Sequence, residues 1–501
     1  MELSSKKKLG LNTVTSLAMQ VTSVVLGFVL PRLIIGKYGS SVNGLVGSIQ
    51  QFLTVISFLE LGVGAVVESA LYKPLAERNM ARVSEVISSA NRYFKRIAII
   101  LLVYVAVLIG VYPTFVNTEF DFVYTAALIA AMCLNLFSEY YFGIVDGLLL
   151  LADQRGYVQY LTRIATLAIN IIACAVLIKL GASIQLVKLT TSLIYVARPF
   201  VYRLYVKKHY SINRRVKYKE EPIKQKWNGI AQHISSFVLD GTDVMVLTVL
   251  SDLANVSIYN AYSMVLTGIK NLMLSLTHGV KAYMGELWAK QEVEKLRTFF
   301  SWIEWLVHNA TVFVFGCASV LIVPFISVYT DGVTDANYIV PAFGILLTVA
   351  HGMHCLRLPY ILMIFAGNHY KQTQTNFIIS AAINIVISVL TVKFWGLIGV
   401  TLGTLAAMLF QTTWMAWYIS KNLIKWPFSN YLIRLGTDAL IWAAGFFACS
   451  WIKLGSVSYL SWAVMALETC GIFLVVTLAV NLVFYPKNVK KALSLVIRRK
   501  R

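Results

Sequence analysis

The sequence predicts an all-α polytopic membrane protein with about fourteen transmembrane helices, and three observations support this fold class. Of its 501 residues, 58% are hydrophobic and 13% are charged, whereas soluble domains carry about 25% charged residues. Apolar runs of about 20 residues, long enough to cross a bilayer, recur along the whole chain. One segment of the first half also recurs in the second half, which is typical of transporters built from repeats.

The recurring segment reads AINIIACAVLIKLG at 168–181 and AINIVISVLTVKFWG at 382–396. Asn170 falls on Asn384 in this alignment. Both copies lie in apolar sequence, so each predicts a membrane helix with a polar side chain near its centre. We therefore expect two similar halves, with a transport site near their interface.

Hydropathy places the candidate helices in order along the chain. Their limits are 9–36, 43–73, 93–113, 122–151, 156–179, 185–206, 227–251, 256–289, 298–328, 337–366, 373–395, 397–420, 430–453 and 459–485. The first range is not followed by a cleavage-like site of small residues, so we expect it to be a retained helix.

Helices one to six and seven to twelve form the predicted repeat. Six is an even number, so both lobes enter the membrane from the same side and the repeat is parallel. The expected organisation is an N-terminal lobe (1–206), a basic cytoplasmic linker (207–226), a C-terminal lobe (227–422), two further helices (423–486) and a basic cytoplasmic tail (487–501).

The net charge of +21 is distributed unevenly. With the N-terminus in the cytoplasm, most Lys and Arg fall on the cytoplasmic side, as the positive-inside rule requires. An even number of spans then places both termini in the cytoplasm. Topology and contact with anionic lipids explain the charge, and no nucleic acid partner is needed. For the linker and tail, docking of a partner enzyme is the alternative.

Residues 59–77 read LELGVGAVVESALYKPLAE and precede a basic amphipathic loop. This stretch resembles the second helix of bacterial oligosaccharide flippases of the multidrug/oligosaccharidyl-lipid/polysaccharide (MOP) exporter superfamily. That superfamily also contains the lipid II flippases and the MATE drug exporters. The likeness extends to the layout of the whole chain, with two six-helix lobes, a basic linker and two extra helices.

The resemblance implies alternating access between two helical bundles in the bacterial cytoplasmic membrane. It implies a substrate made of a short oligosaccharide linked by diphosphate to a polyprenyl lipid. The flippase would move this lipid to the outer leaflet for cell-surface polysaccharide biosynthesis, alongside a polysaccharide polymerase or glycosyltransferases. We expect no cofactor; coupling to Na⁺ or H⁺ stays open.

Basic residues inside the spans are candidates for substrate binding, because a charge near the bilayer centre usually faces a cavity or a partner. Lys270 and Lys281 would share one face of helix 256–289 and suit a diphosphate; pairing with acids is the alternative. Arg32 follows Pro31 near the outer end of the first helix. Resemblance to the lipid II flippases implies a substrate role for Arg32, and snorkelling to the interface is the alternative.

His351, His354 and Arg357 recur every three residues and form one polar strip of helix 337–366. Neutral histidines could bond to sugar hydroxyls, and Arg357 could hold an acid. Packing is the alternative. No third ligand is spaced with the histidines, so we predict no metal site.

Among the acids, Asp240 and Asp243 lie three residues apart on helix 227–251. Two carboxylates that close do not readily both ionise, which is how a proton or sodium site can be tuned. They are the first candidates for ion coupling, and Glu60 is the second.

Glu139 and Asp146 share a face of helix 122–151. We expect them to pair structurally with Arg163 and Arg198 on the next two helices.

Other classes of membrane protein fit less well. A membrane glycosyltransferase usually carries its catalytic residues on a sizeable outer loop, and the outer loops here are short. An ATP-driven pump needs a GxxxxGK[ST] loop, which the sequence lacks. We therefore predict a secondary-type transporter and no enzyme. A MATE-like ion-coupled exporter of small cationic compounds is the serious alternative, although the basic residues within the spans favour the flippase.

Overall fold

The chain is an all-α, multi-pass membrane protein in the computed structural model, with one 3-10 turn, one π-helical turn and no strand among the described residues. The structure describes all residues except 1–4, 61, 117–119, 217, 219–220, 224–229, 276, 278–279 and 499–501. It also leaves out the side chains of 5, 6, 9, 230–236, 240, 493 and 495–498.

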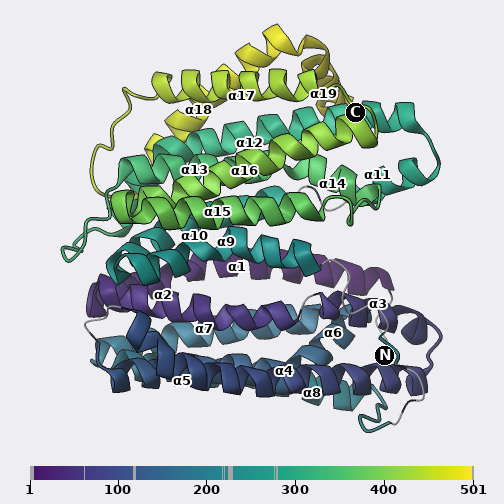
Figure 1. The fold of residues 1–501 in the computed structure, drawn as a ribbon, viewed down its shortest axis with the longest axis vertical. Helices are drawn as coiled ribbons and strands as arrows, with labels where there is room; N and C mark the ends of the chain where they lie inside the picture. The colour runs from purple at the N-terminus through teal and green to yellow at the C-terminus, as the bar shows by residue number, and fades with distance from the viewer. Residues whose placement is uncertain are drawn as a thin grey trace. The chain divides into compact units, whose positions relative to one another are not determined.

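The helices form two compact units (Figure 1). Unit 1 comprises Met1–Ile234 and Asp252–Ser257, and unit 2 comprises Ser235–Ser251 and Ile258–Arg501. The elements up to the linker are α1 (Ser5–Tyr38), α2 (Ser40–Thr54), η1 (Val55–Leu59), α3 (Val63–Ala76), α4 (Met80–Phe115), α5 (Phe122–Ser138), η2 (Glu139–Gly143), α6 (Ile144–Ala152), α7 (Tyr157–Lys179) and α8 (Ile184–His209). The elements after it are α9 (Ile230–Leu250), α10 (Leu253–Ser275), α11 (Val280–Ala289), α12 (Val293–Tyr329), α13 (Pro341–Leu356), α14 (Leu358–Ala366), α15 (Gln374–Trp395), α16 (Leu397–Asn422), α17 (Phe428–Ala448), α18 (Tyr459–Phe484) and α19 (Pro486–Arg498).

Helices fall on every one of the predicted ranges. Among the described residues, ten of them are both long enough and apolar enough to cross a membrane. The ranges 185–206, 227–251, 256–289 and 430–453 carry helices that are not among these ten. The predicted number of spans therefore stays a prediction, while the helical, multi-pass character of the chain is established.

Four ranges predicted as single helices are divided in the structure. In range 43–73, the first helical part ends at Leu59. Helix α3 starts only after Gly62, whose φ of 73° lies in the left-handed region. Such a backbone conformation suits glycine and interrupts a right-handed helix. Range 256–289 is divided between Ser275 and Val280, so Lys270 and Lys281 do not lie on one continuous helix as we expected.

The other two divisions also follow from particular residues. Range 337–366 breaks at Arg357, and α14 then has Pro359 in its first turn, where the missing backbone donor is tolerated. In range 122–151, a π-helical turn covers Glu139–Gly143. A Cβ on Gly143 would lie 2.8 Å from Pro199 Cγ, so glycine is required for this close approach to α8. Single π-turns of this kind are frequent at functional sites.

Unit 2 has its closest helix packing between α15 and α16, which run side by side (Figure 1). A Cβ on Gly399 would lie 2.6 Å from the Thr391 carbonyl carbon, and a Cβ on Gly403 would lie 2.2 Å from Ser388 Oγ. The two glycines are four residues apart and let the backbones meet, as small residues do between membrane helices. The mid-helix Asn384 is therefore held directly against α16.

The two asparagines of the recurring segment have comparable surroundings. Asn170 in α7 is buried and donates from Nδ2 to the Tyr195 hydroxyl on α8 (3.2 Å). Asn384 in α15 is buried and donates from Nδ2 to Thr404 Oγ1 on α16 (2.9 Å). Each asparagine thus ties its helix to the next one along the chain.

Gly403→Ala should lower the free energy of unfolding by about 1–3 kcal/mol, because the added methyl group overlaps Ser388 and the Asn384 carbonyl oxygen. The matched control is Gly436→Ala in α17, where no atom lies within 4 Å of the added Cβ. The control should be neutral or slightly stabilising, since alanine favours a helix over glycine. Thermal unfolding of the purified protein in detergent measures both. Equal unfolding temperatures for the two variants would contradict the packing described here.

Candidate functional site

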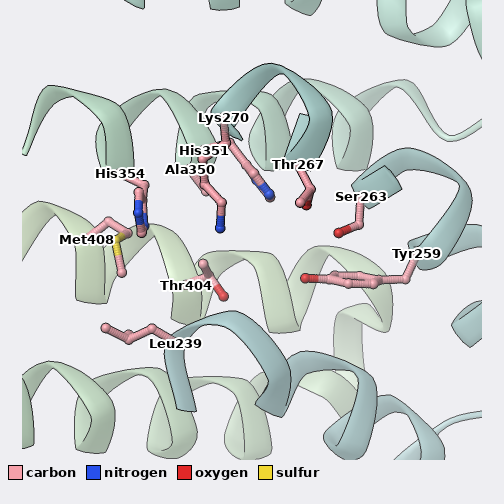
Figure 2. Close-up of a pocket in the computed structure, with 10 residues that line it drawn as sticks. All are labelled: Leu239, Tyr259, Ser263, Thr267, Lys270, Ala350, His351, His354, Thr404 and Met408. Atoms are coloured by element: carbon pink, nitrogen blue, oxygen red, sulfur yellow. The ribbon is translucent and has the colours of Figure 1, made fainter. Parts of the chain in front are cut away.

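A recess of about 390 Å³ lies within unit 2 and draws its lining from α9, α10, α13 and α16. The described lining residues are Leu239, Tyr259, Ser263, Thr267, Lys270, Ala350, His351, His354, Thr404 and Met408. Figure 2 shows the Lys270 ammonium group and the Tyr259 and Thr404 oxygens directed into the same space. Polar groups converge here from helices that are otherwise apolar, so this recess is the main candidate site.

One side of the recess is basic. Lys270 on α10 is only 9% exposed, and His351 and His354 reach the recess from the last turns of α13. The Arg357 guanidinium follows at the helix break, where its Nη2 lies 3.2 Å from His354 Nε2 and its Nη1 donates to Gln411 Oε1. None of the described lining residues is acidic. The recess therefore presents donors and positive charge, which suit an anion.

The opposite side of the recess covers an oxygen-rich network centred on Asp243 of α9, which is 2% exposed. Asp243 Oδ2 accepts from the Tyr259 hydroxyl (2.9 Å) and from Thr404 Oγ1 (2.7 Å). Thr404 in turn accepts from Asn384, and Thr242 Oγ1 donates to Asn384 Oδ1 (2.7 Å). Carboxylate, hydroxyl and amide oxygens are the ligands that hard cations prefer. The network joins four helices and touches the recess through Tyr259 and Thr404.

The predicted substrate-binding residues divide into two groups. Lys270, His351 and His354 line the recess together, and Arg357 contacts His354. Lys281 lies outside it on α11, with its ammonium group 5.3 Å from the Phe365 ring centroid and 5.8 Å from that of Tyr370. Because the helix is interrupted before Val280, Lys281 does not continue the basic side that Lys270 begins.

Arg32 lies on α1, in unit 1, one turn before Gly36. It is not among the residues of the unit 2 recess. Of the ion-coupling candidates, Asp243 occupies the centre of the oxygen network. The side chain of Asp240 lies outside the described part of the structure.

Glu60 lines a second recess of about 730 Å³, within unit 1. The Tyr140 hydroxyl donates to Glu60 Oε2 (3.3 Å), and Glu139 lies 3.9 Å from Arg163 Nη2 across the same recess. The predicted pair of Glu139 with Arg163 is therefore present.

The expectation that Asp146 pairs with Arg163 or Arg198 is wrong. Asp146 pairs with Arg214 of the linker (2.5 Å), and Arg198 instead donates to Thr166 and lies over the Tyr195 ring. The fully buried Asp146 carboxylate thus takes its cation from the segment that the sequence analysis predicted as a basic cytoplasmic linker.

The sequence analysis missed a cluster of four buried polar side chains from α12 and α17. Glu304 and His308 on α12 meet Arg434 and Asp438 on α17, and all four side chains are buried. Each helix contributes two residues four apart, a spacing that places both on one face. The two pairs could have predicted this cluster from the sequence. Ionisable residues within membrane helices are costly and need partners.

Comparison with known proteins leaves the sequence unassigned but identifies the fold. No protein-family model matches the sequence, and no curated protein matches it. Among solved structures, an inward closed conformation of the lipid II flippase MurJ has a TM-score of 0.71 at 14% identity, covering 96% of this chain and 99% of that one.

Two further solved structures share the architecture. An inward-facing multidrug resistance MATE transporter of the MOP superfamily has a TM-score of 0.64 at 15% identity, covering 81% of this chain and 98% of that one. A MOP superfamily transporter from Pyrococcus furiosus, described as having a binding pocket of reversed polarity, has a TM-score of 0.54 at 15% identity, covering 84% and 97% of the two chains. The chain therefore has the fold of MOP superfamily transporters.

Proposed function

We propose that the protein is a flippase that moves a polyprenyl-diphosphate-linked oligosaccharide from the inner to the outer leaflet by alternating access. In this proposal the protein is a secondary-type transporter, not an enzyme. It works in the bacterial cytoplasmic membrane with both termini in the cytoplasm, and supplies cell-surface polysaccharide biosynthesis. A polysaccharide polymerase or glycosyltransferases would act before or after it.

The basic recess of unit 2 is the observation that carries the proposal. Lys270, His354 and Arg357 bring cationic and donor groups together inside a membrane-spanning bundle. Such groups are costly in hydrocarbon and are retained where they meet a substrate or partner. A diphosphate offers several anionic oxygens that would accept hydrogen bonds from these groups. The figure of about 390 Å³ includes open solvent, and the space that a bound group could occupy in this conformation is about 30 Å³. The recess would therefore have to widen during alternating access to take a diphosphate headgroup.

The fold supports this proposal without deciding it, because the lipid II flippase and the MATE exporter share it. A MATE-like ion-coupled exporter of small cationic compounds is the second candidate. The observation that favours it is the unit 1 recess, where Glu60 and Glu139 would attract a cation. The single Arg163 beside Glu139 offsets part of that charge. The two recesses differ in the sign of their lining charge, with Lys270 in unit 2 and two glutamates beside one arginine in unit 1. The cation of the unit 2 recess favours an anionic substrate.

The Asp243 network is the proposed coupling element. A cation bound by the oxygens of Asp243, Asn384 and Thr404 would draw α9, α15 and α16 together beside the recess. Na⁺ or H⁺ would then bias the equilibrium between conformations, as any ligand with different affinities for two states does.

Depletion of the protein from cells should cause a complete, unpolymerised lipid-linked repeat unit to accumulate, because its transfer to the outer leaflet would stop. Mass spectrometry of the extracted polyprenyl-diphosphate lipids measures this and identifies the sugar. Complementation with Lys270→Gln should fail to clear the lipid, since the variant loses a cation of the recess. A lack of accumulation, together with new sensitivity to cationic drugs, would favour the exporter instead.

The matched control for this complementation is Lys281→Gln. It removes the same charge from the neighbouring helix, outside the recess. The control should clear the accumulated lipid as the wild type does. Equal failure of both variants at normal membrane levels would contradict a specific role for Lys270.

Asp243→Asn should abolish stabilisation of the protein by the coupling cation, because the amide keeps the size of the carboxylate but lacks its charge. The measurement compares the unfolding temperature in NaCl with that in choline chloride at equal ionic strength. The comparison is then repeated at several pH values. A bound ion raises the unfolding temperature by mass action. Asp335→Asn, at an exposed loop position, is the control and should keep the response. A wild-type response retained by Asp243→Asn would remove Asp243 from the coupling site.

A further inference from the structure

We propose that Glu304, His308, Tyr360 and Asp438 form a proton-binding site in unit 2, separate from both the basic recess and the Asp243 network. The ligand of the site is a single proton, carried by His308. This inference goes beyond the proposed function and does not depend on the identity of the transported substrate.

Three hydrogen bonds link the four side chains in series. The Tyr360 hydroxyl donates to Glu304 Oε1 (2.7 Å). His308 Nε2 lies 3.1 Å from the same hydroxyl oxygen, and His308 Nδ1 lies 2.6 Å from Asp438 Oδ2. The series runs from a carboxylate, through a phenol and an imidazole, to a second carboxylate.

The three hydrogen bonds need one more hydrogen than the four side chains supply in their usual protonation states. Each hydrogen bond needs its own hydrogen, so three bonds need three. A phenol provides one and a neutral imidazole provides one, whereas ionised Glu304 and Asp438 provide none. Because Tyr360 already donates to Glu304, the additional hydrogen lies between His308 Nδ1 and Asp438 Oδ2. We assign it to His308, because imidazole is ordinarily a stronger base than a carboxylate. With this assignment His308 is a protonated imidazolium.

Counting charges leads to the same result. Arg434 Nε donates to Glu304 Oε2 (2.7 Å), and the Trp426 indole donates to the same oxygen (3.1 Å). The Arg434 guanidinium thus balances Glu304. The Asp438 carboxylate is left facing His308, and a buried carboxylate needs either a compensating cation or a proton of its own. A proton on His308 makes the whole cluster electrically neutral.

The surroundings supply no other acid or base in hydrogen-bond contact with His308 among the described residues. Glu304 and His308 are 0% and 1% exposed, so bulk solvent does not reach the series. The remaining titratable neighbours are two tyrosines. The Tyr431 ring stacks edge-on against Tyr360, with its hydroxyl 3.0 Å from Thr413 Oγ1, and the Tyr485 ring lies under the Arg434 guanidinium.

The proton connects three helices. Asp438 belongs to α17, His308 and Glu304 belong to α12, and Tyr360 lies in the first turn of α14. Loss of the proton removes one hydrogen, so one of the three bonds must break. Tyr360 N donates to the carbonyl of Arg357 (3.1 Å), at the break between α13 and α14. Proton release would therefore loosen the connection between α17 and the helix break that carries Arg357.

The test is ¹⁵N NMR of the full-length protein in lipid nanodiscs after labelling with ¹⁵N-histidine. The chain has seven histidines, and the His308 signals are assigned by their disappearance in His308→Gln. At neutral pH, wild-type His308 should show two protonated nitrogens.

Asp438→Asn is the decisive variant. The asparagine amide can itself donate to His308 Nδ1, so all three bonds then form with a neutral imidazole, and the cluster stays uncharged. The imidazolium signal should be lost at neutral pH while the protein remains folded by circular dichroism. Asp335→Asn, which removes an exposed carboxylate, should leave the signal unchanged. A neutral wild-type His308 at neutral pH, or an imidazolium that persists in Asp438→Asn, would overturn the proposal.

Discussion

Compensation of buried charge is the constraint on which the structure of unit 2 depends. The helices pass through an environment in which an uncompensated charge is expensive, so each ionisable side chain has to meet a partner or a ligand. Three arrangements satisfy this requirement in different ways. Glu304 meets Arg434 directly, Asp243 is held by neutral hydroxyl groups, and Lys270 lines an open recess. The first is an ion pair, the second is a network of hydrogen bonds, and the third places a cation beside a recess.

The helix breaks determine where these groups lie. The break between α13 and α14 separates the residues that line the recess from those of the buried Glu304 cluster. His354, before the break at Arg357, lines the recess and contacts Arg357, whereas Tyr360, after Pro359, belongs to the buried cluster. The close α15–α16 packing at Gly403 has a related effect, since it holds Asn384 against Thr404, which donates a hydrogen bond to Asp243. Irregular backbone and small residues thus determine the chemistry of the bundle.

The sequence predicted the helical membrane fold because apolar length is a local property that composition reveals directly. It also brought Lys270, His351 and His354 to attention, since charged and polar residues in apolar runs are conspicuous. Prediction from the sequence failed for contacts between residues that lie far apart in the chain. The pairing of Asp146 with Arg214, and not with Arg198, requires the linker to fold back onto α6. The Glu304 cluster required knowledge that α12 and α17 are neighbours, and the division near Ser275 separated Lys281 from Lys270.

The most direct measurement of the central claim is transbilayer movement in proteoliposomes. The probe is a fluorescent polyprenyl-diphosphate N-acetylglucosamine, and its appearance in the outer leaflet is followed by dithionite quenching. The account predicts that wild-type protein and Lys281→Gln accelerate movement of the probe over empty vesicles, and that Lys270→Gln does not. Equal movement in empty and protein-containing vesicles, with uptake of a small organic cation by the same preparation, would contradict the flippase and establish the exporter in its place.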